Sequence, residues 1–282
     1  MTIRDLFRIS IGLLIRGYMR FSIITVCFNA GDKLKNTIEN ILKQTETDYE
    51  IIVKDGGSSD NSLSCLPSDS RIKVFSQNDK GIYDAMNEAV KKASGEYVIF
   101  MNCGDSFYDA NVLKNTSKII EENPGRKIYY GDAFFCEAAE VISQPGEITE
   151  SICYRHMPNH QSCFFDRHLW DDDGFDTSYK IRADYDFFLR AFFVKKISPC
   201  YLNMTVASYE GGGYSETKEN RERDKAEHRE ICVKYMGKKK ANHYRRIMRL
   251  TLQPLRTWIS HKSPFAGAYD KVKKKVYQRG SK

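Results

Sequence analysis

The first hundred residues alternate between short apolar runs and amphipathic segments. Four runs have the length of strands: 21–29, 49–55, 71–76 and 96–102. Two segments between them repeat apolar residues every three or four positions, as one face of a helix does: Leu34, Ile38, Ile41 and Leu42, then Ile82, Ala85, Met86, Ala89 and Val90. Strands that are apolar on both faces and alternate with helices form a parallel sheet covered by helices. The pattern therefore predicts an α/β fold.

Polar residues follow each of these strands. Asn29 and Asp55 end the first and second runs, and Asp79 and Asp105 follow the third and fourth. In open parallel sheets, ligands bind beyond the carboxyl ends of the strands. We therefore expect these four positions to surround a binding site.

The second half of the chain has a less regular pattern. It predicts a strand at 127–135, a loop entering a strand at 157–165, a helix at 181–193, a glycine-rich loop at 209–215 and a charged helix from about 216 to 235. The helix at 181–193 has Asp184 in its first turn and apolar residues on its later face. A carboxylate there either favours the helix dipole or faces a cleft as a general base does.

Both ends of the chain are basic. Residues 1–20 place four arginines at multiples of four beside apolar positions, which fits an ordinary packed helix or a helix lying on a membrane surface. From 234 to 282 the chain has fifteen Lys and Arg against one acid, a net charge of +14. Because the whole chain carries +7, the preceding residues carry −7. The basicity belongs to the tail.

The eight cysteines are scattered, with no CxxC pair. No apolar signal peptide precedes them, which predicts reduced thiols in a cytosolic protein. The apolar runs are shorter than the ~20 residues that span a bilayer. Cys153, His156, His160 and Cys163 have side chains that bind zinc, but their short spacing lacks the spacer of a zinc finger, so an ordinary loop is favoured.

Two strand ends carry candidate chemistry. The stretch "DGGSSD" at 55–60 offers acids, hydroxyls and a tight glycine turn, but it is neither a dinucleotide-binding GxGxxG nor a P-loop with its lysine. The stretch "NCGD" at 102–105 leaves one carboxylate, Asp105, where the chain turns. Taken alone, Asp105 is more consistent with a turn residue than with a metal ligand.

Four segments in order, "SIITVCFN", "EIIVKDGGSSDNS", "DKGIYDAMNEAVKKASGEYVIFMNCGDSF" and "ADYDFFLR", resemble the family 2 glycosyltransferases, the large inverting group with the GT-A fold. The likeness covers about 21–215, and "DKGIYDAMN" with "NCGD" is most similar to the branch that builds bacterial surface polysaccharides. It implies a GT-A type α/β domain with a mostly parallel sheet over 21–236. A basic amphipathic segment, 1–20, precedes this domain, and a basic helical extension, 237–282, follows it.

The resemblance implies a nucleotide-sugar donor, a UDP- or GDP-sugar, and a divalent cation, Mg²⁺ or Mn²⁺. The family has an Asp-x-Asp type motif after the fourth strand, which makes Asp105 the implied metal ligand. One carboxylate together with donor phosphates can hold such a cation. Asn102 replaces an acid of the same motif and is expected to contact the donor.

The same resemblance assigns further residues of the site. Asp55 is expected to contact the nucleotide, and Asn29, Lys80 and Gly81 to line its pocket. Asp184 inherits the role of catalytic base, since "ADYD" matches the family's "EDYD", whereas Asp186 does not. The remaining expected positions, His160 and Gln161 of the family's "HQ" and Gly212 of the glycine-rich loop, lie where sugar and acceptor meet.

The acceptor implied by the resemblance is a saccharide on a polyprenyl diphosphate at the cytoplasmic face of the membrane. The basic tail suits an anionic lipid surface, and this places the protein on the inner face of the cytoplasmic membrane as a peripheral protein. Nucleic acid is not expected as a partner, although a basic tail could also bind it or simply be solvated. The replaced acids leave one alternative, a catalytically weakened nucleotide-sugar-binding or scaffold protein of the same fold.

Overall fold

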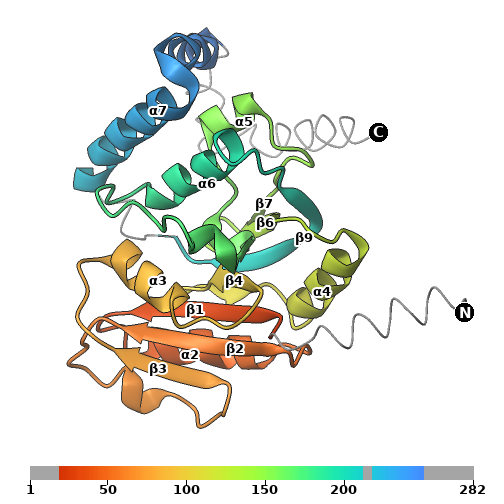
Figure 1. The fold of residues 1–282 in the computed structure, drawn as a ribbon. Coiled ribbons are helices and arrows are strands. Elements are labelled where there is room, and N and C mark those ends of the chain that lie inside the picture. Colours follow the sequence, from red (N-terminus) through yellow and green to blue (C-terminus); the bar gives the residue numbers. More distant parts are fainter. Residues whose placement is uncertain (1–18, 212–217, 251–282) are drawn as a thin grey trace, which may run out of the picture.

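A computed structural model describes residues 19–211 and 218–250 of the 282 residues. Their strands form one nine-stranded sheet, in the order β3-β2-β1-β4-β8-β6-β9-β5, with β7 paired to β6 (Figure 1). The strands are β1 (Phe21–Cys27), β2 (Tyr49–Asp55), β3 (Ile72–Ser76), β4 (Tyr97–Phe100), β5 (Ser106–Phe107), β6 (Ile128–Phe135), β7 (Glu140–Ile142), β8 (Cys163–Asp166) and β9 (Cys200–Tyr209). The helices are α2 (Asp32–Leu42), α3 (Ile82–Val90), α4 (Val112–Glu122), α5 (Glu150–Arg155), α6 (Ala183–Phe193) and α7 (Lys218–Leu250).

The first four strands form the parallel part of the sheet. β1 pairs in parallel with β2 and β4, and β2 pairs with β3. Every residue of β1, β2 and β4 is buried, and successive side chains enter opposite layers. Ile24 packs on the side of α3 and α6, and Ile23 on the side of α2 and α4. This period of two explains the continuous apolar runs, because both faces are covered.

Beyond β4 the sheet becomes mixed. β8 runs antiparallel to β4 and β6, and β6 runs parallel to β9. The expected strands at 127–135 and after residue 162 are confirmed, as is the helix begun by Ala183. The ten-residue strand β9 was not predicted, although it leads directly into the expected glycine-rich loop. The expected mostly parallel α/β architecture is confirmed.

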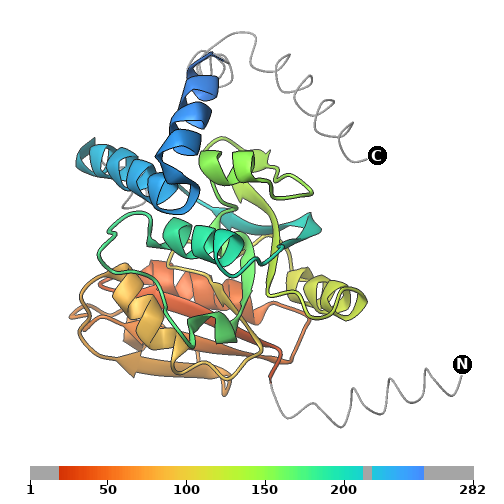
Figure 2. The ribbon, with the colours of Figure 1, turned by 45° about the horizontal axis from the view of Figure 1, so that its top comes forward.

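The long charged helix α7 lies against α6 in both ribbon views (Figures 1 and 2). It extends beyond the predicted end near 235, and its backbone leaves the helical conformation at Gly237, where φ is 77°. The two arms of the helix therefore meet at an angle, seen clearly in Figure 2. No helix in 19–211 or 218–250 is long and apolar enough to cross a membrane.

Candidate active site

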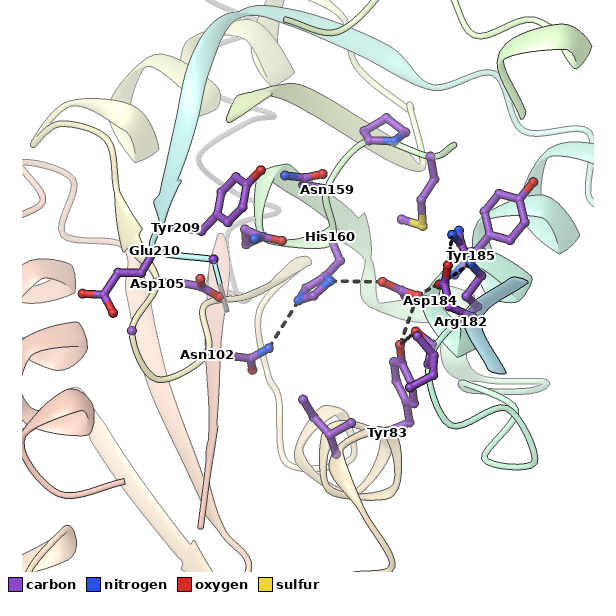
Figure 3. Close-up of a pocket in the computed structure, with 18 of the residues that line it drawn as sticks. Tyr83, Asn102, Asp105, Asn159, His160, Arg182, Asp184, Tyr185, Tyr209 and Glu210 are labelled. Atoms are coloured by element: carbon purple, nitrogen blue, oxygen red, sulfur yellow. Dashed lines mark hydrogen bonds and ion pairs between the residues drawn. The ribbon is translucent and has the colours of Figure 1, made fainter. Parts of the chain in front are cut away.

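A cavity of about 600 Å³ opens at the carboxyl end of β4. It is bounded by the loop after β4, the 3₁₀ turn His160–Ser162, the start of α6 and the end of β9 (Figure 3). Five of the predicted site residues line it: Asn102, Asp105, His160, Gln161 and Asp184. The fold therefore brings together residues more than eighty positions apart in the sequence.

The loop of residues 102–105, called the β4 loop below, presents Asp105 to the cavity. The Asp105 amide donates to the Asn102 carbonyl over 2.9 Å, and Gly104 takes the positive φ of 97° that this turn requires. Thr37 on α2 braces the loop, since its hydroxyl accepts from the Gly104 amide and donates to the Asp105 carbonyl. Within the described part of the chain, no side chain forms a hydrogen bond or ion pair with the Asp105 carboxylate.

The surroundings of Asp105 disfavour a negative charge. Burial raises the pKa of Asp105 to about 6, against the opposing effects of His160 and of hydrogen bonding within the loop, and the nearby Glu210 adds to the rise. Asn102 beside it has a buried Oδ1 for which the described residues provide no hydrogen-bond partner. These two oxygen groups at one strand end are the kind that bind Mg²⁺ or Mn²⁺ together with donor phosphates, so the residues present fit such a cation.

Asp184 has the opposite environment. Its Oδ2 lies 3.1 Å from His160 Nδ1, and its Oδ1 accepts from the Tyr83 hydroxyl over 3.1 Å and from the Tyr185 amide over 2.8 Å. Burial alone would raise the pKa of Asp184, but the hydrogen bond and charge of His160 outweigh it and lower that pKa. Asp184 is therefore held as a carboxylate at neutral pH.

His160 links the two carboxylate environments. Its Nδ1 faces Asp184, and its Nε2 lies 3.3 Å from Asn102 Nδ2 in the β4 loop (Figure 3). Burial would lower the pKa of His160, but the hydrogen bond and charge of Asp184 and the charge of Asp105 raise it overall. One ring therefore connects the strand end to the start of α6.

Helix α7 supports the start of α6. Glu227 is buried, and its carboxylate accepts from the backbone amides of Lys180, Ile181 and Arg182, each over 2.9 Å. Arg182 also pairs with Asp224, one turn earlier on α7, at 2.7 Å. The position of Asp184 therefore depends on contacts from a helix more than thirty residues later.

Asp186, two residues after Asp184, faces away from the cavity. It is fully buried and accepts from the Lys234 ammonium and the Tyr235 hydroxyl, both on α7. It is thus part of the packing between α6 and α7, whereas Asp184 lines the cavity.

Asp55 and Asn29 lie outside the cavity and organise the turn after β2. The fully buried Asp55 carboxylate accepts from the amides of Gly57 and Ser58 and from the hydroxyls of Ser58 and Ser76. These hydrogen bonds lower its pKa, although burial opposes them. Asn29 Oδ1 accepts from the amide of Ser59. Both residues hold backbone amides in place at the strand ends.

Lys80 and Gly81 also lie outside the cavity, just before α3. The Lys80 amide donates to Asp84 and the Gly81 amide donates to Asp79. Asp79 in turn pairs with the buried Lys54 at 3.2 Å. Gly212 of the glycine-rich loop lies outside the described residues, as do most of 1–20 and all of 251–282.

The structure also shows site features that the sequence reasoning missed. Phe28, directly after β1, is 66% exposed and lies 3.4 Å from the point where a Cβ on Gly56 would stand. Tyr83 and Glu227 hold Asp184 and the segment before it. The sequence shows an aromatic residue at the end of the first apolar run, and this signal could have identified Phe28. The contacts of Tyr83 and Glu227 can be seen only in the folded structure.

The zinc alternative is not supported. Among the described residues, no three His, Cys, Asp or Glu side chains are placed to hold a metal. His160 contacts Asp184, and His156 contacts the carbonyl of Met157. The short Cys and His pattern therefore runs from the end of α5 through a loop to the start of β8, and its His160 lines the cavity.

A parallel sheet that becomes mixed after β4, with a cavity at that change, defines a GT-A type glycosyltransferase fold. The family model described as "Glycosyl transferase family 2" matches residues 22–168, about half of the chain. A "PGL/p-HBAD biosynthesis glycosyltransferase" of Mycobacterium tuberculosis is 31% identical over 204 residues, which are 70% of this chain and 79% of the relative. The chain belongs to glycosyl transferase family 2.

Solved structures share the fold at low identity. S. aureus TarS 1-349 in complex with UDP has a TM-score of 0.58 at 18% identity, covering 86% of this chain and 78% of that chain. The mannosyltransferase PcManGT from Pyrobaculum calidifontis, in complex with GDP-Man and Mn²⁺, has a TM-score of 0.62 at 15% identity, covering 95% and 80%. In a comparison with a longer TarS chain, the aligned region covers only 43% of that chain.

Proposed function

We propose that this protein is an inverting glycosyltransferase that moves a sugar from a nucleotide-diphosphate donor to a hydroxyl group of a saccharide. The observation that carries the proposal is the pair of carboxylates in one cavity. Asp184 is kept ionised by its partners, and Asp105 stands at the strand end without one. A transferase of this kind needs a base for the acceptor and a cation site for the leaving diphosphate.

Asp184 is the proposed base. An ionised carboxylate offers about four lone-pair sites, and three are occupied by His160, Tyr83 and Tyr185. The remaining site can accept the acceptor's hydroxyl proton. As that proton moves to Asp184, the acceptor oxygen bonds to the anomeric carbon, and the bond from this carbon to the donor's diphosphate breaks. The nucleoside diphosphate leaves with the electron pair, and the anomeric configuration inverts.

Asp105 is the proposed protein ligand of Mg²⁺ or Mn²⁺, with the Oδ1 of Asn102 close by. A bound cation supplies charge neutralisation for the leaving diphosphate. PcManGT, whose structure contains GDP-Man and Mn²⁺, has the same fold and supports this role. The chain's own contribution is to hold Asp105 in the braced β4 loop, facing the cavity.

The nucleotide is proposed to lie along the ends of β1, β2 and β3. There Asp55 and Asn29 fix the turn after β2, Lys80 and Gly81 open α3, and the exposed ring of Phe28 offers a face for the base. The TarS structures contain UDP and UDP-GlcNAc. We therefore propose a UDP- or GDP-sugar as the donor.

On the other side of the cavity, His160, Gln161 and Gly212 are proposed to meet the sugar and the acceptor. The mycobacterial relatives are named for PGL/p-HBAD biosynthesis, which supports a glycan of the cell envelope as the product. We propose a surface-polysaccharide role, such as O-antigen, capsule or exopolysaccharide synthesis, with an acceptor linked to a polyprenyl diphosphate.

The basic tail, 237–282, is the proposed contact with the cytoplasmic face of the membrane, with 21–236 as the catalytic domain and 1–20 as a basic N-terminal segment. Each Lys or Arg near an anionic surface contributes about 1 kcal/mol. A chain ending at residue 236 should lose its sedimentation with anionic vesicles at low salt. Unchanged sedimentation would contradict the role of the tail.

Donor hydrolysis tests the enzyme itself. With Mn²⁺ present, the protein should slowly release UDP or GDP from one nucleotide sugar of a panel, and Asp105→Ala should abolish the release. Binding of that donor without release or transfer by the wild type would instead favour a weakened nucleotide-sugar-binding protein. Retained anomeric configuration in the transfer product, read by NMR, would contradict inversion.

A further inference from the structure

Glu210, at the end of β9, stands over the position where the β4 loop lacks an acid. Gly104 carries no side chain, and Glu210 Oε2 lies 3.8 Å from the point where a Cβ on Gly104 would be. An aspartate's own carboxylate oxygens lie about 2.4 Å from its Cβ. The Glu210 carboxylate therefore comes close to the space that an acid at position 104 would use.

The same side of the cavity gathers other oxygen groups. Figure 3 shows Glu210, Asp105 and Asn102 along one side, opposite Asp184, and all four line the cavity. The buried Oδ1 of Asn102 lacks a hydrogen-bond partner within the described residues. A divalent cation such as Mn²⁺ prefers carboxylate and amide oxygens and completes its shell with phosphates and water.

The present partner of Glu210 is weakly held. Its carboxylate lies 3.6 Å from the Lys33 ammonium, and the two side chains are 64% and 66% exposed. An exposed pair of this kind contributes at most about 1 kcal/mol. A divalent cation can therefore compete with Lys33 for Glu210, and Lys33 would then be free to face the donor's diphosphate.

From this placement we infer that Glu210 is a second protein ligand of the divalent cation in the donor complex, replacing from β9 the acid that the β4 loop lacks. The inference rests on the proposed metal-dependent transferase. It adds a ligand from a different part of the sheet, so that the cation joins the end of β4 to the end of β9. Lys33 competes with the cation for this carboxylate.

Mn²⁺ binding tests this without measuring activity. The free Mn²⁺ signal in electron paramagnetic resonance is titrated against full-length protein saturated with UDP or GDP. Glu210→Gln should weaken Mn²⁺ binding about tenfold, the effect of losing one charged ligand. Lys33→Gln should tighten binding severalfold, because it removes both the competitor and a repelling charge.

Glu39→Gln on α2 is the matched control. Glu39 is 47% exposed and pairs with Lys35. The Glu39→Gln variant loses the same charge as Glu210→Gln, so its Mn²⁺ affinity should stay at the wild-type value. Equal binding by the Glu210 and Glu39 variants would overturn the inference. A loss in Lys33→Gln equal to that in Glu210→Gln would also overturn it, because the ion pair would then be the important feature.

Failure of the broader proposal gives a different result. If the wild type bound Mn²⁺ no better with UDP or GDP than without, the proposed metal dependence would be contradicted. The proposed role of Glu210 would then be contradicted as well. If the wild type bound Mn²⁺ and Glu210→Gln bound it equally, only the role of Glu210 would fall. Nucleotide binding without metal should be equal in both proteins, which shows that the variant keeps its fold.

Discussion

Asp105 and Asp184 line the same cavity, but their surroundings differ in almost every respect. Asp184 is surrounded by donors that stabilise its charge, whereas Asp105 is partly buried with no such donor in the described chain. Burial raises the pKa of Asp105 to about 6, while the pKa of Asp184 is lowered, because His160 and its other partners outweigh burial. The fold stabilises one carboxylate by itself and leaves the other to a ligand.

The supports of the two residues differ as well. Asp105 belongs to a short turn held by Thr37 on the neighbouring α2. Asp184 begins a helix whose preceding segment is held by Glu227 on α7. The Asp105 side of the cavity is thus built from contacts with the neighbouring α2, and the Asp184 side from contacts with the last described helix. The predictions below test this contrast.

Loss of the base should have the largest effect. Asp184→Asn removes the proton acceptor and should lower turnover about 100- to 10,000-fold while donor binding persists. Asp186→Asn is the contrasting variant, because Asp186 packs against Lys234 and Tyr235 outside the cavity. It should lower the melting temperature but keep the turnover of each folded molecule near wild type. Near-normal turnover in Asp184→Asn would remove its role as base.

Loss of His160 should weaken the base without removing it. In His160→Ala the burial of Asp184 remains but the hydrogen bond and charge that oppose it are gone, so the pKa of Asp184 should rise. The acidic limb of the pH profile of kcat/KM should therefore move to higher pH, with roughly a tenfold fall in kcat.

The matched control for this pH profile is His168→Ala. His168 is exposed and pairs with Asp171, away from the cavity. Its profile should superimpose on that of the wild type. An unshifted acidic limb in His160→Ala would show that His160 does not set the charge of Asp184.

Loss of Glu227 should separate the two sides of the cavity. Glu227→Ala leaves three backbone amides without their acceptor, which should cost about 2 to 3 kcal/mol of unfolding free energy in urea. Glu230→Ala, on the same helix, removes one contact, to the Tyr179 hydroxyl, and should cost less than about 1 kcal/mol. Mn²⁺ binding with UDP or GDP should be retained in both. Its loss in Glu227→Ala would show that the two sides are not independent.

The last comparison concerns stability at Asp105. The folded pKa of Asp105, about 6, lies above the ordinary aspartate value of about 3.8, so the wild type loses stability as pH rises through this window. Without divalent cations, Asp105→Asn should therefore be more stable at pH 7.5, by on the order of 2 kcal/mol after allowing for partial exposure. The difference should vanish below the unfolded pKa.

Asp184→Asn should move the other way in the same urea titrations. The pKa of Asp184 is lowered, so its charge contributes stability above the unfolded pKa of about 3.8, and this is lost as pH falls. The variant should be less stable at pH 7.5. Changes of equal sign in the two variants would contradict the contrast between these carboxylates.

The sequence predicted the parallel part of the fold well, because β1, β2 and β4 are apolar on both faces and α2 and α3 have regular helical spacing. It missed β9, where polar and apolar residues mix around Leu202 and Val206 and the pairing with β6 shifts in register. The charged helix was predicted to end near 235, close to Gly237 where the backbone bends, and beyond the bend the helix continues into the basic extension as far as Leu250.

The site divides in the same way. The β4 loop could be predicted from the sequence as part of a binding site, because ligands bind where the carboxyl ends of parallel strands meet at one edge of the sheet. Tyr83 meets Asp184 across 101 positions, and Glu227 meets Ile181 across 46. Such pairings depend on how helices pack on the sheet, which no local pattern records. The resemblance named Asp184 and His160, but the hydrogen bond between them appears only in the structure.

The bend at Gly237 has a consequence for orientation. The arm before it holds α6, and the arm after it is fastened to α5, where Glu150 accepts from Lys240 and Tyr244. Residues other than glycine rarely adopt a φ of 77°. The backbone bend at this one residue therefore sets the direction of the arm 238–250 relative to α6.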